Sequence, residues 1–168
     1  MKTIKGFITI LTLTLMFSAV AASQTVLSTL DGIRVDLDNQ KGKVVVLAIG
    51  AAWLPLSAKQ AEFANVLVKK YAGKNVVFYF VATDSTNAKS KNFSSTENIR
   101  KFALANKLSI PIMRDSDGAA TFGKYEIDQV PSFVILNKNG DRIGEPFGGI
   151  DPKYDITIPI SKAIDKLL

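Results

Sequence analysis

The chain has 168 residues, a formal net charge of +6, and neither cysteine nor histidine. These absences exclude disulfides, thiolate nucleophiles, Cys/His zinc sites and Ser–His or Cys–His catalytic pairs. The densest basic group, at residues 89–91, lies in a Ser/Asn-rich stretch with no basic stripe or aromatic platform, so we expect no nucleic-acid binding.

The first 22 residues have the build of a secretory signal peptide. Lys2 and Lys5 give a basic start, residues 7–20 are mostly apolar, and residues 19–23 are small. The alternative is an uncleaved membrane anchor, but the apolar run is short of the about 20 residues that a span needs. We therefore expect a signal peptide over residues 1–22, no stable membrane anchor after its cleavage, and export to the bacterial periplasm or the extracellular space. Residues 23–168 then suit one domain with its own core.

The first elements of this domain are predicted from turn and apolar patterns. The Asp31-Gly32 pair between alternating flanks predicts a β-hairpin over residues 29–37. The unbroken apolar run 44–49 predicts a strand buried on both faces, as in a parallel sheet. Pro55 suits the first position of a helix that extends to Tyr71. The predicted core stripe of this helix is Phe63, Val66, Leu67 and Tyr71.

The middle of the chain continues the alternation of strand and helix. Residues 76–82 are a second strand of the buried type, and residues 83–95 are a polar surface loop. Ser94 followed by Glu97 resembles a capping box at the start of the next helix. The apolar face of that helix is Ile99, Phe102 and Ala103.

The last third is predicted to add a short extended piece, a short helix, a hairpin and a final helix. These lie at residues 110–113, 119–125, 132–147 and about 160–167, with 142–147 as the second strand of the hairpin. Helices between buried strands favour the α/β class, with a central mixed sheet, helices on both faces and an N-terminal β-hairpin.

The order and spacing of several segments together resemble a known family. The segments are Ala52-Trp53 with Pro55, residues 115–118, residues 130–136 and Asn139-Gly140. They resemble the thioredoxin-like fold, and in particular its exported TlpA/ResA-type thiol–disulfide branch, over about residues 26–168.

The departures from this resemblance concern the chemistry. The resemblance places the two active-site cysteines at Leu54 and Ser57, and an acidic residue that helps to move protons at Gln60. Because dithiol exchange requires thiols, we expect no thiol–disulfide oxidoreductase activity, and we expect no cofactor and no metal. The aspartates Asp84, Asp115, Asp117 and Asp128 are not spaced as a metal-binding loop and are interpreted as loop and turn residues.

The altered loop presents apolar side chains at the start of a helix. Leu54 cannot cap the helix N-terminus. The side chains of Leu54 and Leu56 either form an exposed patch with Trp53 or pack onto the core, and the sequence leaves both open. The altered active-site loop comprises Trp53, Leu54, Pro55, Leu56, Ser57 and Gln60.

The resemblance also implies a peptide-binding strand edge opposite this loop. It implies a cis bond between Val130 and Pro131, and the backbone near Val130 could then pair with an extended peptide. The predicted peptide-binding residues are Trp53, Leu54, Val130 and Pro131.

Three hypotheses for function follow. The first is an exported, redox-inactive protein that binds a protein or an extended peptide on this face. The second is an enzyme that uses an external thiol such as glutathione, with the Ser57 hydroxyl as donor, although a first-turn serine is the simpler interpretation. The third is a structural protein whose site has decayed.

Overall fold

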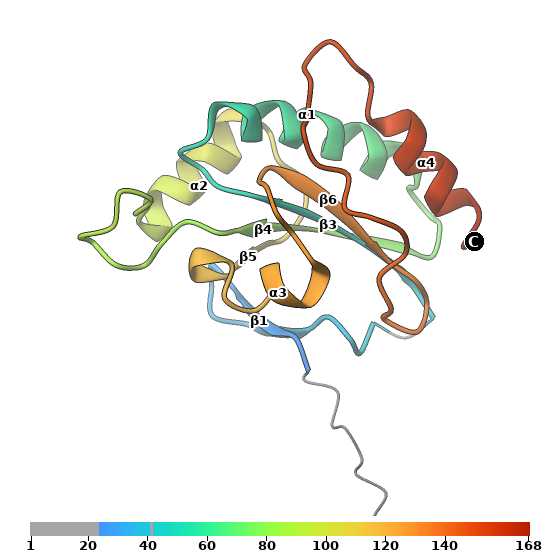
Figure 1. Ribbon diagram of the computed structural model, residues 1–168, viewed down its shortest axis with the longest axis horizontal. Helices are drawn as coiled ribbons and strands as arrows, with labels where there is room; N and C mark the ends of the chain where they lie inside the picture. Colours follow the sequence, from blue (N-terminus) through green and yellow to red (C-terminus); the bar gives the residue numbers. More distant parts are fainter. Residues whose placement is uncertain (1–23, 41) are drawn as a thin grey trace, which may run out of the picture.

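A computed structural model describes residues 24–40 and 42–168, so the signal peptide expected at residues 1–22 lies outside the described residues. One six-stranded sheet crosses the molecule in the order β2-β1-β5-β4-β3-β6 (Figure 1). The strands are β1 (Val26–Thr29), β2 (Arg34–Asp36), β3 (Val44–Gly50), β4 (Val76–Ala82), β5 (Ile112–Arg114) and β6 (Ser132–Leu136).

The strand pairing confirms the predicted mixed sheet. β3 pairs in parallel with β4, and β4 pairs in parallel with β5, which gives the parallel centre. β6 lies antiparallel to β3, and β1 and β2 form the N-terminal hairpin. The helices are α1 (Pro55–Lys70), α2 (Thr96–Ala105), α3 (Phe122–Tyr125) and α4 (Thr157–Asp165), with a 3-10 turn, η1, at Ser116–Gly118.

The sheet has a hydrophobic core on each face. Val44, Val46 and Ala48 of β3 face the core beneath α1, α2 and α4, whereas the alternate residues Val45 and Leu47 face the core that includes Tyr125 of α3. In Figure 1, α1, α2 and α4 cover one side of the sheet and α3 lies on the other. Burial on both faces explains why β3 is apolar at every position instead of alternating.

Two predictions for helices are wrong in detail. α2 is capped by Ser95, whose Oγ accepts a hydrogen bond from the Asn98 N–H at 3.1 Å, so the predicted cap at Ser94 is one residue too early. Val66 of α1 is 48 % exposed, although Phe63, Leu67 and Tyr71 are buried as predicted. Val66 therefore belongs to the outer face of α1.

The prediction of a second strand at residues 142–147 in the C-terminal hairpin is also wrong. Residues 142–147 pair with β6 in two isolated bridges, from Arg142 to Leu136 and from Phe147 to Phe133, and do not form a continuous strand ladder with it. Gly144, with a φ of 68°, bends the segment away, and Pro146 has no N–H to donate to a ladder. The predicted helix at 119–125 shortens for a different reason, because η1 and a turn precede the single helical turn of α3.

Burial of Tyr125 beneath the sheet predicts a loss of stability at high pH. Burial raises the pKa of Tyr125 from 10.0 to about 12. The neutral phenol is thus favoured in the folded state, and the stability that this gives is present below pH 10 and is lost as the pH rises towards 12. We expect the free energy of unfolding of Tyr125→Phe to fall less between pH 9 and pH 11.5 than that of the wild type, by on the order of 2 kcal/mol. Urea unfolding at the two pH values measures this, and equal losses for the two proteins would contradict it.

Candidate functional site

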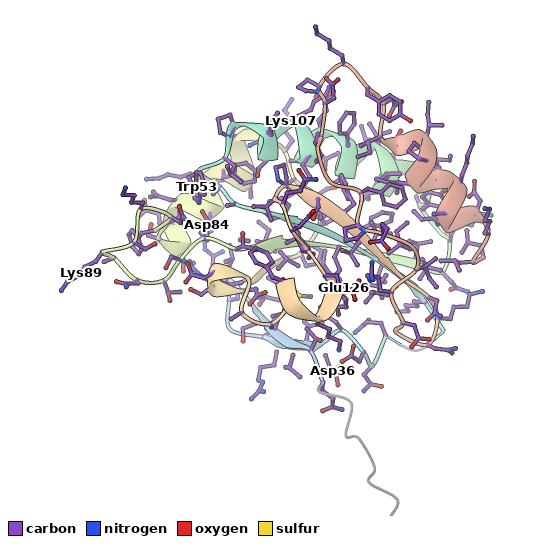
Figure 2. The ribbon with its side chains drawn as sticks, in the orientation of Figure 1. Asp36, Trp53, Asp84, Lys89, Lys107 and Glu126 are labelled. Carbon is purple, nitrogen blue, oxygen red and sulfur yellow. The ribbon has the colours of Figure 1, made fainter. Side chains whose placement is uncertain are left out.

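The loop between β3 and α1 is held by a buried carboxylate that follows the neighbouring strand, β4. The backbone N–H of Ala52 donates to both carboxylate oxygens of Asp84, at 3.0 Å each, and Asp84 is fully buried just beyond β4. Trp53 and Asp84 lie at the same end of the molecule (Figure 2). Because β3 and β4 are parallel, their carboxyl ends meet at one edge of the sheet, and this is where the loop lies.

The first turn of α1 lacks a side-chain cap, as predicted. Leu54 is the N-cap residue, with extended backbone angles of φ −82° and ψ 123° and no side-chain hydrogen bond. The N–H of Ser57 donates to the Leu54 carbonyl at 3.0 Å, which closes the turn. The N-terminus of α1 is therefore closed by backbone hydrogen bonding alone, and the side chain of Leu54 does not interact with its free N–H groups.

Ser57 faces the protein interior. Its side chain is fully buried, and its Oγ accepts a hydrogen bond from the Ala51 N–H at 3.2 Å. A hydroxyl in this position cannot reach a thiol in solution. The structure therefore gives no support to the hypothesis that Ser57 stabilises an external thiolate, and the simpler interpretation as a first-turn serine fits.

Gln60 has a structural role that the sequence did not reveal. Its Nε2 donates to the carbonyls of Ile49, at 3.2 Å, and of Ser132, at 2.7 Å, and the side chain is fully buried. It thereby joins α1 to β3 and to the residue that follows Pro131. An amide can donate to two carbonyl oxygens, whereas an ionised carboxylate can only accept. Gln60 thus acts here as a clamp between three elements.

Gly50 provides the space for this clamp. A Cβ atom at position 50 would lie 2.4 Å from Gln60 Oε1 and 2.9 Å from Ser57 Oγ, which is too close for either contact. The Oε1 atom itself is buried without a hydrogen-bond partner among the described residues. The glycine and the glutamine therefore fit as a pair at the end of β3.

The side chains above the clamp are exposed. Trp53 is 46 % and Leu56 39 % exposed, Pro55 is exposed, and Leu54 is half-buried. The structure therefore favours the exposed patch for Trp53 and Leu56 and places Leu54 at its edge. We call Trp53, Leu54, Pro55 and Leu56, together with Val130 and Pro131, the loop face.

The strand edge beside the loop is open at Val130. The Val130–Pro131 bond is cis, as the resemblance implied. Ile49 pairs with Ser132, so the chain just before β6 lies beside the loop that follows β3. In the described part of the chain, the backbone N–H and C=O of Val130 form no hydrogen bond, whereas those of Phe133 pair with Phe147. Val130 therefore has unpaired backbone groups at this edge, whereas Phe133 does not.

Asp84 is the main residue of the site that sequence reasoning placed only as a loop aspartate. Its position directly after a strand of the buried type was the available signal, because polar residues there lie at the carboxyl edge of a parallel sheet. Arg114 of β5 supports the loop at residues 83–95, which contains Asp84. Its Nη2 donates to the carbonyls of Ser85 at 3.0 Å and Ser94 at 2.5 Å. Within residues 24–40 and 42–168, no three Asp or Glu side chains gather as metal ligands.

Comparison with known proteins agrees with the fold described above. The profile of the Redoxin family matches residues 17–155. The chain belongs to the Redoxin family. It is 26 % identical over 127 residues to the thiol-disulfide oxidoreductase ResA of Bacillus cereus, a match that covers 76 % of this chain and 68 % of that protein. It is 32 % identical over 114 residues to the thioredoxin-like protein YneN of Bacillus subtilis, covering 68 % and 62 %.

Solved structures confirm the thioredoxin-like fold of this redoxin. One is a secreted Mycobacterium tuberculosis disulfide oxidoreductase homologous to Escherichia coli DsbE, with a TM-score of 0.62 and 19 % identity over 84 % of this chain and 95 % of that one. Among the described residues, no helix has the length and hydrophobicity to cross a membrane. This redoxin thus shares the scaffold of thiol–disulfide oxidoreductases but has no cysteine.

Proposed function

We propose that this chain is a redox-inactive redoxin that binds an extended polypeptide on the loop face. The observation that carries the proposal is the combination of an exposed apolar loop, at Trp53 and Leu56, with the unpaired backbone of Val130 at the adjacent strand edge. The backbone groups would pair with a peptide strand, and the apolar side chains would contact its side chains.

The missing cysteines exclude dithiol exchange but not the binding of a polypeptide. Disulfide exchange needs a thiolate, and the 168 residues contain none. Peptide pairing needs only a fixed backbone, and Asp84 and Gln60 fix it on both sides of the loop. An exposed apolar patch on such a fixed frame is typical of an interaction surface.

We further propose that the protein acts outside the cytoplasm. The signal peptide predicted at residues 1–22 supports this, as does the structural neighbour that is described as secreted. A partner in the periplasm or the extracellular space follows from this location. Cleavage is tested by sequencing the N-terminus of the mature protein, which we expect near residue 23.

The loop face is tested by substitution of its half-exposed leucines. We expect Leu54→Asp and Leu56→Asp each to weaken capture of the partner from the exported compartment by at least about fivefold, since a charge in an apolar contact loses on the order of 1–3 kcal/mol. Both variants should fold, because an aspartate at the N-cap or in the first turn favours a helix. The measurement is quantitative mass spectrometry of captured proteins, with circular dichroism as the check on folding.

The matched control is Ile158→Asp on α4. Ile158 is 53 % exposed and lies on a different element, so its replacement adds the same charge outside the loop face. If Leu54→Asp, Leu56→Asp and Ile158→Asp all capture the same proteins as the wild type, the loop face has no such role, and the protein is better interpreted as structural.

A further inference from the structure

A second surface continues from the loop face along the outer side of α1. It is a hollow of about 760 Å³ between α1, the end of α2 and Pro152, and Pro55 and Leu56 belong to both surfaces. Its volume lies within the range of about 300–1,000 Å³ that is typical of ligand sites. We call it the α1 groove.

The groove wall formed by α1 has a definite pattern. Leu56, Lys59, Glu62, Val66 and Lys69 all line it and recur at intervals of three or four residues, so they lie on one helix face. The exposed apolar side chains, Leu56 and Val66, are ten residues apart and hence about 15 Å apart along the axis. An extended chain covers nearly the same distance, about 13 Å, in four residues.

The charge of the groove is positive. Lys59 is paired with Glu62 at 2.8 Å, whereas Lys69 and Lys107 form no ion pair with any described residue. Lys107 follows α2 and has a φ of 50°, a backbone conformation that glycine adopts at lower cost than other residues. The chain nevertheless has a lysine here, and its charged side chain lines the groove. Figure 2 shows Lys107 beside α1. Two lysines without an ion pair among the described residues thus border a groove whose α1 wall carries the exposed apolar side chains Leu56 and Val66.

The groove is formed without a partner. Asn65 Nδ2 donates to the Asn106 carbonyl at 3.2 Å, and Asn65 Oδ1 accepts from the N–H and the hydroxyl of Ser109, each at 3.3 Å. These bonds join α1 to the end of α2 at the base of the groove. A ligand would therefore bind without first ordering its walls.

We infer that the α1 groove binds an acidic segment of the partner polypeptide, with two apolar side chains that contact Leu56 and Val66 and carboxylates that pair with Lys69 and Lys107. This inference rests on the proposed function, because the groove opens from the loop face at Pro55 and Leu56. It adds the chemistry of the partner, which the loop face alone leaves undefined.

The test is a titration of the 15N-labelled protein with synthetic 12-residue peptides, followed by NMR. The first peptide carries two leucines four residues apart among glutamates, the second has lysines in place of the glutamates, and the third has serines in place of the leucines. We expect the first to shift the amide signals of Val66, Lys69 and Lys107, and the other two to bind at least about tenfold more weakly, the loss of one good contact. Lys69→Glu/Lys107→Glu should weaken binding of the first peptide by a similar factor. The charge-matched control, Lys162→Glu on α4 combined with Lys166→Glu just after it, changes two exposed lysines elsewhere and should not.

The outcomes separate this inference from the proposed function. Shifts at Trp53 and Val130 without shifts at Val66, Lys69 or Lys107 would overturn the groove but leave the loop face standing. Equal binding of the acidic and the basic peptide would contradict the inference that the partner segment is acidic. So would the absence of shifts at 1 mM peptide, because a site with a Kd of about 1 mM is half-filled at that concentration.

Discussion

Replacement of Leu54 and Ser57 by cysteine together is expected to give this chain a disulfide that it cannot otherwise form. The Ser57 N–H bonds to the Leu54 carbonyl at 3.0 Å, so the backbones of the two positions lie one turn apart. Residues so placed lie within the Cα separation of about 4.4–6.8 Å that a disulfide requires. Leu54→Cys would also lie at the uncapped N-terminus of α1, which lowers a thiol pKa from about 8.5 towards 7.

Thiol titration and insulin reduction measure this outcome. We expect the double variant to have two free thiols when reduced and none when oxidised, and its reduced form to reduce insulin. The wild type has no cysteine, so it has no thiol in either state and should not reduce insulin. The single variants Leu54→Cys and Ser57→Cys are the matched controls, because each has a thiol but no partner for it within the chain. Two free thiols after oxidation of the folded double variant would show that the loop no longer has the geometry of a thiol–disulfide site.

The second large effect is expected where Gly50 meets Gln60. Gly50→Ala places a methyl group 2.4 Å from Gln60 Oε1 and should reduce the free energy of unfolding by about 2–3 kcal/mol. Gln60→Ala removes the bonds to Ile49 and Ser132 and leaves a cavity, which should cost about 2–4 kcal/mol. The double variant should be more stable than the sum of the single effects predicts, by about 1–2 kcal/mol, because the closer of the two clashes, with Gln60 Oε1, disappears with the side chain while that with Ser57 Oγ remains.

Urea unfolding of the four proteins measures this coupling. Gly123→Ala is the matched control, because a Cβ at position 123 meets no atom within 4 Å and the residue lies in a helical turn. Its stability should match or slightly exceed that of the wild type. Strictly additive losses at positions 50 and 60 would mean that the two residues do not form a pair.

Much of the fold could be predicted because local patterns and tertiary structure agree. The continuous apolar runs of β3 and β4 indicated strands buried on both faces, and Pro55 and the Asp31-Gly32 turn marked the helix start and the hairpin. Residues 142–147 could not be predicted, because Gly144 and Pro146 interrupt a pattern that otherwise suits a strand. Val66 fits the helical period but lies beyond the edge of the buried stripe. Whether a side chain at that edge is buried depends on how neighbouring elements pack, which the sequence does not show.

The site was predicted as a set of positions but not as a set of contacts. The family resemblance placed the altered loop and implied the cis bond before Pro131, whereas the sequence left the direction of Leu54 and Leu56 open. The roles of Asp84 and Gln60 depend on backbone groups that lie 32 and up to 72 residues away along the chain. These groups come together only when the sheet forms, so no local sequence pattern could reveal the contacts of Asp84 and Gln60.

The central claim is that the loop face contacts a polypeptide without redox chemistry, and photo-crosslinking in the native host tests it most directly. A benzophenone-bearing amino acid would replace Trp53, which is 46 % exposed on the loop face, or Ile158, which is 53 % exposed on α4. We predict that irradiation gives a discrete protein adduct from position 53 that is absent from position 158. Identical adducts from both positions, or none from position 53, would contradict the account.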